Sequence, residues 1–144
     1  MTRTATFAAG LTATLAVAAS FAATASAAIY SGDVKGLPDS DIYLTFTRDE
    51  GRLYLEQVEL QNYPLHCENG DSTLSTTWYV APEGRVEHRG FKVSRPAPAR
   101  FLVSGDLRGG GKARGVLRET RQGETQAQGT CDTGRLEWTA QKGI

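Results

Sequence analysis

Short apolar runs that alternate with polar residues, separated by turns rich in glycine and proline, constrain the fold of this chain most. The 144 residues include 16 glycines and five prolines, and the apolar runs recur about every ten residues, as in all-β sandwiches and barrels. From Ile42 to Thr47 every second residue is apolar, which places one face of a strand inward. No segment shows the apolar periodicity of an amphipathic helix. We therefore expect an all-β fold, an antiparallel meander of about eight strands closed as a small barrel or folded into a sandwich.

Turn residues divide the chain into its strands. Asp49 to Gly51 and Gly109 to Gly111 form hairpin turns, because glycine accepts the positive φ that such loops need. Apolar positions switch parity after Leu55, which predicts a β-bulge near Glu56 and Gln57. Breaks are expected at the segments that contain proline, and residues 122–129 are expected to form an exposed loop. The breaks lie at residues 36–40, 62–64, 81–84 and 96–98.

An N-terminal secretory signal peptide is predicted over residues 1–27. Arg3 supplies a positive charge, residues 7–21 are apolar and rich in alanine, and Ala25-Ser26-Ala27 is a small-residue cleavage site. The apolar stretch is shorter than the roughly 20 residues that a bilayer span needs. We expect a single all-β domain over residues 28–144, secreted or periplasmic after cleavage near Ala27, with no membrane span.

Cys67 and Cys131 are the two cysteines of the chain. An exported chain reaches an oxidising compartment, so a disulfide between them is expected. Closing a loop of about 65 residues stabilises a fold by about 4 kcal/mol in the chain-entropy model. With His66 and His88 as further donors, the spacing matches no zinc site, so no metal is expected.

The two halves of the expected mature chain carry opposite charge. Residues 28–83 hold three basic against ten acidic side chains, and residues 84–144 hold twelve against six, which gives −7 and +6. The sum of −1 argues against a general nucleic-acid binder. Either acidic and basic strands lie side by side and compensate, or the basic half presents a cationic face to an anionic partner.

One hairpin, expected over residues 100–120, concentrates the positive charge. Its outward positions include five basic residues, Arg100, Arg108, Lys112, Arg114 and Arg118. Lys and Arg on an edge strand prevent pairing with other chains. Alternatively, a planar basic face holds phosphate, sulfate or carboxylate groups. Both interpretations stay open here.

Aromatic residues also admit two interpretations. Tyr54, Trp78 and Tyr79 can line a groove for a sugar or a peptide, although Trp78 has an equal claim to the core. Trp138, on the last strand, is the best candidate for a core anchor near the disulfide.

No pattern of residues points to catalysis or to a cofactor. The Gly-x-Ser-x-Gly turn of many serine hydrolases is absent, and His66 and Cys67, as neighbours on a strand, point to opposite faces. Acidic residues such as Asp39 and Asp49 match no calcium loop and are common in turns. A two-carboxylate hydrolase stays open, because its pair can come from any two strands.

The run from Cys131 to Ala140, a Cys-x-x-Gly-x-x-x-Trp-Thr-Ala pattern, resembles a group of small exported bacterial proteins with no assigned activity. Phe91 to Val93, Phe101 to Gly105 and the small residues Ala113 and Gly115 extend the resemblance over residues 42–140. It implies an all-β domain with a disulfide and implies no reaction, so no residue role is carried over.

A non-catalytic, monomeric binding module for an extracellular protein or an anionic polymer is therefore the leading functional hypothesis. The first alternative is an inhibitor of a secreted protease, in which residues 83–89 or 109–114 enter the protease cleft and Arg85 or Arg114 fills a trypsin-like pocket. The second alternative is a small hydrolase. No cofactor is expected for the binding module.

Overall fold

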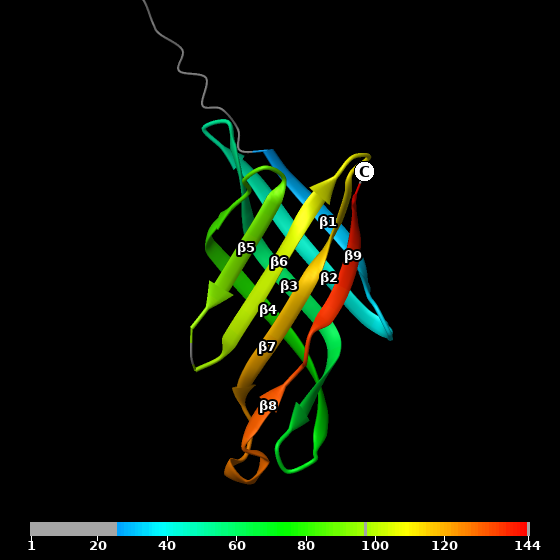
Figure 1. Cartoon of the computed structure of the whole chain (residues 1–144), viewed down its shortest axis with the longest axis vertical. Coiled ribbons are helices and arrows are strands. Elements are labelled where there is room, and N and C mark those ends of the chain that lie inside the picture. The colour runs from blue at the N-terminus through cyan, green and yellow to red at the C-terminus, as the bar shows by residue number, and fades with distance from the viewer. Residues whose placement is uncertain (1–25, 97, 144) are drawn as a thin grey trace, which may run out of the picture.

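The structure, a computed structural model, describes residues 26–96 and 98–143, so all but the end of the predicted signal peptide lies outside the described residues. These residues form nine strands and one short 3-10 helix (Figure 1). The elements are β1 (Ser26–Val34), β2 (Leu37–Asp49), β3 (Arg52–Cys67), β4 (Ser72–Arg85), β5 (Gly90–Arg95), β6 (Arg100–Arg108), β7 (Lys112–Gln122), η1 (Gln126–Gln128), β8 (Thr130–Asp132) and β9 (Leu136–Lys142). No helix within the described ranges is long and apolar enough to cross a membrane.

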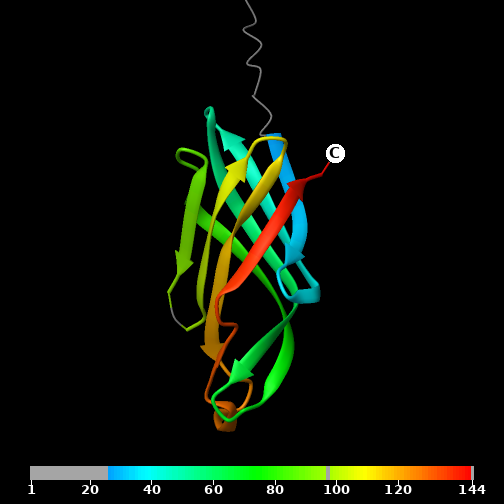
Figure 2. The same cartoon turned by 45° about the vertical axis from the view of Figure 1, so that its right-hand side comes forward.

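All strands belong to one antiparallel sheet with the order β4-β3-β2-β1-β9-β7-β6-β5. The short strand β8 lies off this path and pairs with both β3 and β7, which closes β1, β2, β3, β8, β7 and β9 into a six-stranded barrel. Figure 2 shows β8 at one end of the barrel, beside the turn that joins β3 to β4. The predicted all-β fold is confirmed, and of the two predicted closures it is the barrel that forms.

Alternation along β2 and β3 fills the barrel. Ile42, Leu44 and Phe46 are fully buried, as their period-two pattern predicts. Burying one such side chain contributes about 1.5–3 kcal/mol. The predicted bulge is also present, because Thr45 pairs with Gln57 while the next residue, Phe46, pairs with Leu55. The extra residue keeps the buried positions on the inner face after the switch of parity.

Proline does not break β2 and β3, contrary to the sequence prediction. Between the pairs Asp33 with Asp41 and Val34 with Leu37 the register shifts, so Pro38 lies in a bulge and needs no ladder partner. Pro64 lies beyond Gln61, the last residue of β3 that pairs with β2, so a missing N–H is tolerated there. β4 likewise extends through residues 81–84 to Arg85. Bulges and one-sided pairing thus lengthen three predicted strands.

Trp138 is buried, as predicted, at 2% exposure. Its ring lies against Gly105 and Gly115, which face each other across the β6–β7 ladder. A Cβ on Gly115 would lie 2.5 Å from a ring carbon of Trp138, so glycine is required there. The expected position near the disulfide is wrong. Trp138 pairs with Gly115, whereas Cys131 pairs with Arg121, about 20 Å further along β7 at ~3.3 Å per residue.

The predicted disulfide between Cys67 and Cys131 is present and joins β3 to β8. The two cysteines also face each other in the ladder, with their Cα atoms 3.9 Å apart. The bond therefore fixes the end of the barrel at which β8 completes the ring. At the start of β1, Ala27 pairs with Thr47, so the expected cleavage after Ala27 falls near the end of a strand.

Candidate functional site

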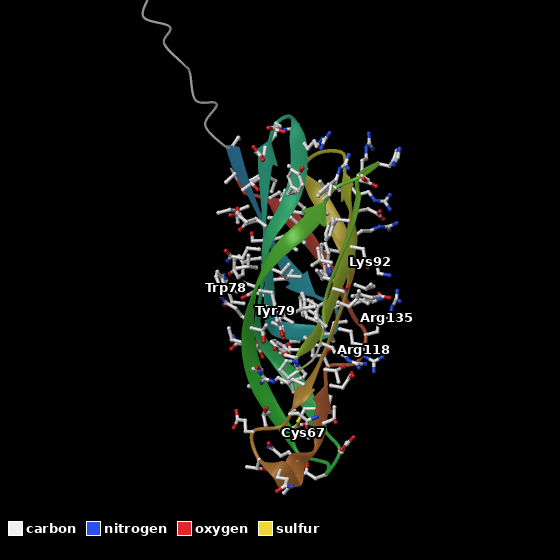
Figure 3. All side chains as sticks on the ribbon, turned by 90° about the vertical axis from the view of Figure 1, so that its left-hand side faces the viewer. Cys67, Trp78, Tyr79, Lys92, Arg118 and Arg135 are labelled. Carbon is white, nitrogen blue, oxygen red and sulfur yellow. A yellow bond between two sulfur atoms is a disulfide. The ribbon has the colours of Figure 1, made fainter. Side chains whose placement is uncertain are left out.

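The five basic residues predicted on the 100–120 hairpin all lie exposed on the outward face of β6 and β7. Lys92 on β5 extends the same face, because it pairs with Ser104, which has the outward parity of β6. Figure 3 shows Lys92 and Arg118 along one side of the barrel and Trp78 on the opposite side. We call this surface the basic wall, defined as Lys92, Arg100, Arg108, Lys112, Arg114 and Arg118.

Both strands that carry most of the basic wall are internal strands. β6 pairs with β5 and β7, and β7 pairs with β6, β8 and β9. Protection of an edge strand, one of the two explanations offered by the sequence, therefore does not apply to this hairpin. The other explanation, a cationic face for an anionic partner, stays a prediction.

Two of the six cations have acidic partners. Arg118 donates from Nε and Nη2 to Asp132 at 3.0 and 2.8 Å, and Arg108 lies 3.6 Å from Asp106. Burial alone would raise the pKa of Asp132, but hydrogen bonds from Arg118, Thr120 and a backbone N–H hold it below its ordinary value. Among the described residues, the other four members of the basic wall form no ion pair.

Like charges face each other at the turn end of the hairpin. Arg108 and Lys112 are direct cross-strand partners, an arrangement that destabilises an antiparallel pair. Together with Arg114 they line a shallow hollow of about 380 Å³. Asp33 lines the same hollow, and Asp106 faces Arg114 across the ladder and lies 3.6 Å from Arg108, so acidic side chains balance the three cations only in part.

The opposite charges of the two halves are separated in space. β1 to β4 are neighbours on one side of the strand order, and β5, β6, β7 and β9 are neighbours on the other. The halves meet where β1 pairs with β9, and close to this boundary Lys35 contacts Glu137 at 3.0 Å. They meet again where β8 pairs with β3. Acidic and basic strands of the two halves therefore lie side by side only at these two boundaries, although Arg108 and Arg118 have acidic partners within the basic half.

Sequence reasoning missed a buried carboxylate inside the barrel. Glu119 is 1% exposed, and its Oε2 accepts hydrogen bonds from the hydroxyls of Tyr63 and Thr77. Its Oε1 has no hydrogen-bond partner within the described residues, although Nε of Arg121 lies 3.7 Å away. The signal was its parity, because residue 119 follows Leu117 on the inward side of β7.

The environment of this cluster raises the pKa values of two tyrosines, Tyr63 and Tyr79. Burial, together with the hydrogen bond to Glu119, raises the pKa of Tyr63 to about 12. Burial and the charge of Glu119 also raise the pKa of Tyr79. The cluster connects β3, β4 and β7 across the interior, and its enclosure indicates a structural role.

The structure does not unite the three candidate groove aromatics. Trp78 and Tyr79 are neighbours on β4 and point to opposite faces, so Trp78 is 58% exposed and Tyr79 is 7% exposed. Tyr54 lies on β3 opposite Arg85, further along the ladder than Trp78 and Tyr79. A core position for Trp78 is therefore wrong.

The alternative functions find less geometric support. Arg114 lies inside β7, paired on both sides, and Arg85 is the last residue of β4 and lies 3.3 Å from Glu87. Neither position is the tip of a loop that could enter a protease cleft. In the part of the chain that the structure describes, no group of three or more His, Cys, Asp or Glu side chains could hold a metal ion.

No family model, no curated protein and no solved structure matches this chain. The function proposed below consequently depends on the charge and geometry of the barrel.

Proposed function

We propose that the protein is an exported, non-catalytic binding module that holds an anionic extracellular partner on its basic wall. The observation that carries this proposal is the position of five of the six cations on β6 and β7, internal strands that need no edge protection. Sulfate, phosphate and carboxylate groups are the chemistry that arginine and lysine recognise. The disulfide supports an oxidising, extracellular-type compartment.

Separated charge makes such binding possible for a chain of zero formal net charge. A polyanion that meets the basic wall faces six cations and two neighbouring carboxylates, Asp106 and Asp132, because most acidic residues lie on the other half of the strand order. The attraction is between exposed groups, so it weakens as salt shortens the screening length to ~8 Å at physiological ionic strength.

Retention on immobilised dextran sulfate and on immobilised polyphosphate tests the proposal. We expect the wild-type protein to be retained at low salt and released as salt rises. The double substitution Lys112→Glu and Arg114→Glu should weaken retention at least about tenfold, since two attractive contacts become repulsive.

The matched control is Arg48→Glu with Arg52→Glu, which makes the same charge change at the β2–β3 hairpin. It should leave retention close to that of the wild type. Equal losses in both double variants would assign binding to net charge alone and reject the basic wall. Intact folding of each variant is checked by near-ultraviolet circular dichroism.

A further inference from the structure

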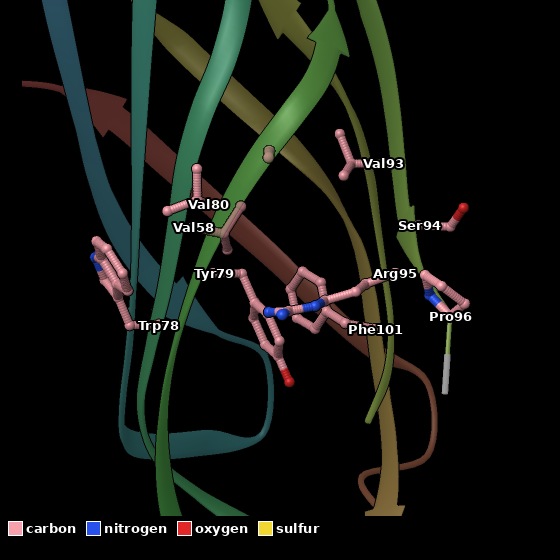
Figure 4. Close-up of a pocket in the computed structure, with 10 residues that line it drawn as sticks. Val58, Trp78, Tyr79, Val80, Val93, Ser94, Arg95, Pro96 and Phe101 are labelled. Carbon is pink, nitrogen blue, oxygen red and sulfur yellow. The ribbon is translucent and has the colours of Figure 1, made fainter. Parts of the chain in front are cut away.

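A second candidate site lies at the seam between β4 and β5, the two strands that end the sheet. Neither strand has a second neighbour in the strand order, and no pairing joins one to the other along the seam. A cavity of about 470 Å³ opens there (Figure 4). Its walls are mainly apolar and include Val58, Tyr79, Ala81, Val93 and Phe101.

The seam is closed at one end and open at the other. Near the β4–β5 turn a Cβ on Gly84 would lie only 3.1 Å from Val93, and Glu87 and Gly90 exchange two backbone hydrogen bonds of 2.8 Å. Further from the turn, residues 78–81 of β4 and 93–96 of β5 line the cavity instead of pairing. The gap is therefore a wedge.

Arg95 occupies an inward position of β5, following Phe91 and Val93 on the same face. The guanidinium lies over the ring of Tyr79, 5.7 Å from its centroid. Tyr79 in turn stacks on Phe101 with ring centroids 4.0 Å apart. Arg95 forms no ion pair with any residue that the structure describes. A cation held by a cation–π contact thus stands at the mouth of an apolar cavity.

We propose that this seam cavity binds a small amphipathic anion, with an aliphatic or aromatic body and one carboxylate or sulfonate group. The body would lie in the cavity beside Tyr79 and the anionic group would meet Arg95. The volume lies in the ~300–1,000 Å³ range of small-molecule sites, which are mostly apolar with a few polar groups.

The wedge favours a compact ligand over an added strand. A strand inserted between β4 and β5 would need both edges about 4.8 Å away along its length. The two edges instead approach each other near Gly84 and Val93 and separate toward Arg95.

This site is independent of the proposed function. Arg95 has the inward parity of β5, whereas Lys92 and the rest of the basic wall face outward. Arg95 also borders a second hollow that Arg100 and Arg118 of the basic wall line. Neither Lys112 nor Arg114 lines the seam cavity, so loss of polyanion binding in their double variant would leave the seam proposal untouched.

Titration of the mature protein with the fluorescent probe anilinonaphthalene sulfonate tests the proposal. We expect saturable binding that decanoate displaces far better than decanol, because the alcohol lacks the charge. Arg95→Ala should lower the affinity for both anions about tenfold or more, as expected for loss of a hydrogen bond between charged groups. Arg95→Lys should recover part of the affinity.

Two control variants separate the seam from other surfaces. Lys92→Ala removes an outward cation from the same strand, and Leu74→Ser removes a 75% exposed apolar side chain from β4. Both should bind the probe as the wild type does.

Several outcomes would overturn the proposal: no saturable binding, unchanged binding in Arg95→Ala, or loss of binding in Leu74→Ser. Equal competition by decanol would also reject the anionic contact. A dimer in sedimentation equilibrium that the probe dissociates would assign the seam to a second copy of the chain. Displacement of the probe by extended peptides but not by decanoate would assign it to a partner strand.

Discussion

Strand β4 and the β6–β7 hairpin reverse the usual distribution of surface residues in a sheet. β4 ends the sheet and has one hydrogen-bonded neighbour, yet its outward side chains include Leu74, Trp78 and Val80, exposed by 75%, 58% and 51%. The hairpin is internal, yet its outward side chains include five cations. Edge strands ordinarily carry the charges, because charges prevent pairing with other chains, and internal strands have no such need.

The reversal separates the requirements of folding from those of binding. Folding explains the inward rows of both regions, which fill one core. It explains neither outward row, since the cations protect no edge and the apolar residues are covered by nothing in the described chain. Under the proposed function the cationic row is the contact surface, whereas the apolar row has no explanation in the fold.

Removing the disulfide that links the two regions should have the largest effect on the free energy of unfolding. The disulfide joins β3, next to β4, to β8, next to β7. Replacing Cys67 and Cys131 by serine should lower the free energy of unfolding by about 4 kcal/mol, because the unfolded chain regains the freedom of a loop of about 65 residues. Urea unfolding measures the loss, and reduction of the wild type should reproduce it. A loss below about 1 kcal/mol would mean that β8 closes the barrel without covalent help.

The interior contact between the two regions should respond to alkaline pH. Tyr63 is neutral when protonated, and its pKa is raised from 10.0 to about 12 in the folded protein. The unfolded chain therefore loses this proton first, so stability is full below pH 10 and falls as pH rises toward 12. The slope is about 1.4 kcal/mol per pH unit for this group.

Urea unfolding between pH 10 and 12 provides the test. Tyr63→Phe removes one titrating group and should make the fall less steep, although Tyr79, whose pKa is also raised, still contributes. The lost hydrogen bonds to Glu119 and Thr77 should lower stability at pH 7. Tyr43→Phe, on the outer side of β2, is the matched control. An unchanged slope in Tyr63→Phe would show that the tyrosine hydroxyl is open to solvent.

Local patterns in the sequence were sufficient for the inward rows, several turns and the disulfide. The alternation around Leu44 and the parity switch at Glu56 are properties of neighbouring residues, so the bulge and core of β2 and β3 could be predicted. The cysteine pair could be predicted because only two cysteines exist.

The remaining features depend on pairing between strands that are far apart in the sequence, and no local pattern predicts such pairing. Which strand ends the sheet depends on how β9 returns to β1, so the hairpin could not be recognised as internal. Pro38 could not be placed in a strand without the register of β1 against β2. The position of Arg95 over Tyr79 likewise joins residues from two strands that do not pair.

Replacing one partner of the like-charge pair on the hairpin should raise the free energy of unfolding slightly. Lys112→Glu places a carboxylate opposite Arg108, and opposite charges in such a pair contribute about 0.2–1 kcal/mol. We expect the variant to be slightly more stable by urea unfolding and less well retained on dextran sulfate. Lys92→Glu, which faces Ser104, is the control and should lack the gain in stability. A loss of stability in Lys112→Glu would indicate that the cation supports the fold.

A charge on the edge strand should have the smallest effect on stability. Val80 is 51% exposed, so Val80→Lys should change the free energy of unfolding by no more than about 0.5 kcal/mol. It should nevertheless reduce concentration-dependent association, measured by light scattering, because a lysine on an edge disfavours strand pairing between chains. Val116→Lys adds the same charge to the outward face of internal β7 and should leave association unchanged. Equal reductions in both variants would show that net charge, and not the open edge of β4, controls association, and the contrast between the two regions would then reduce to charge alone.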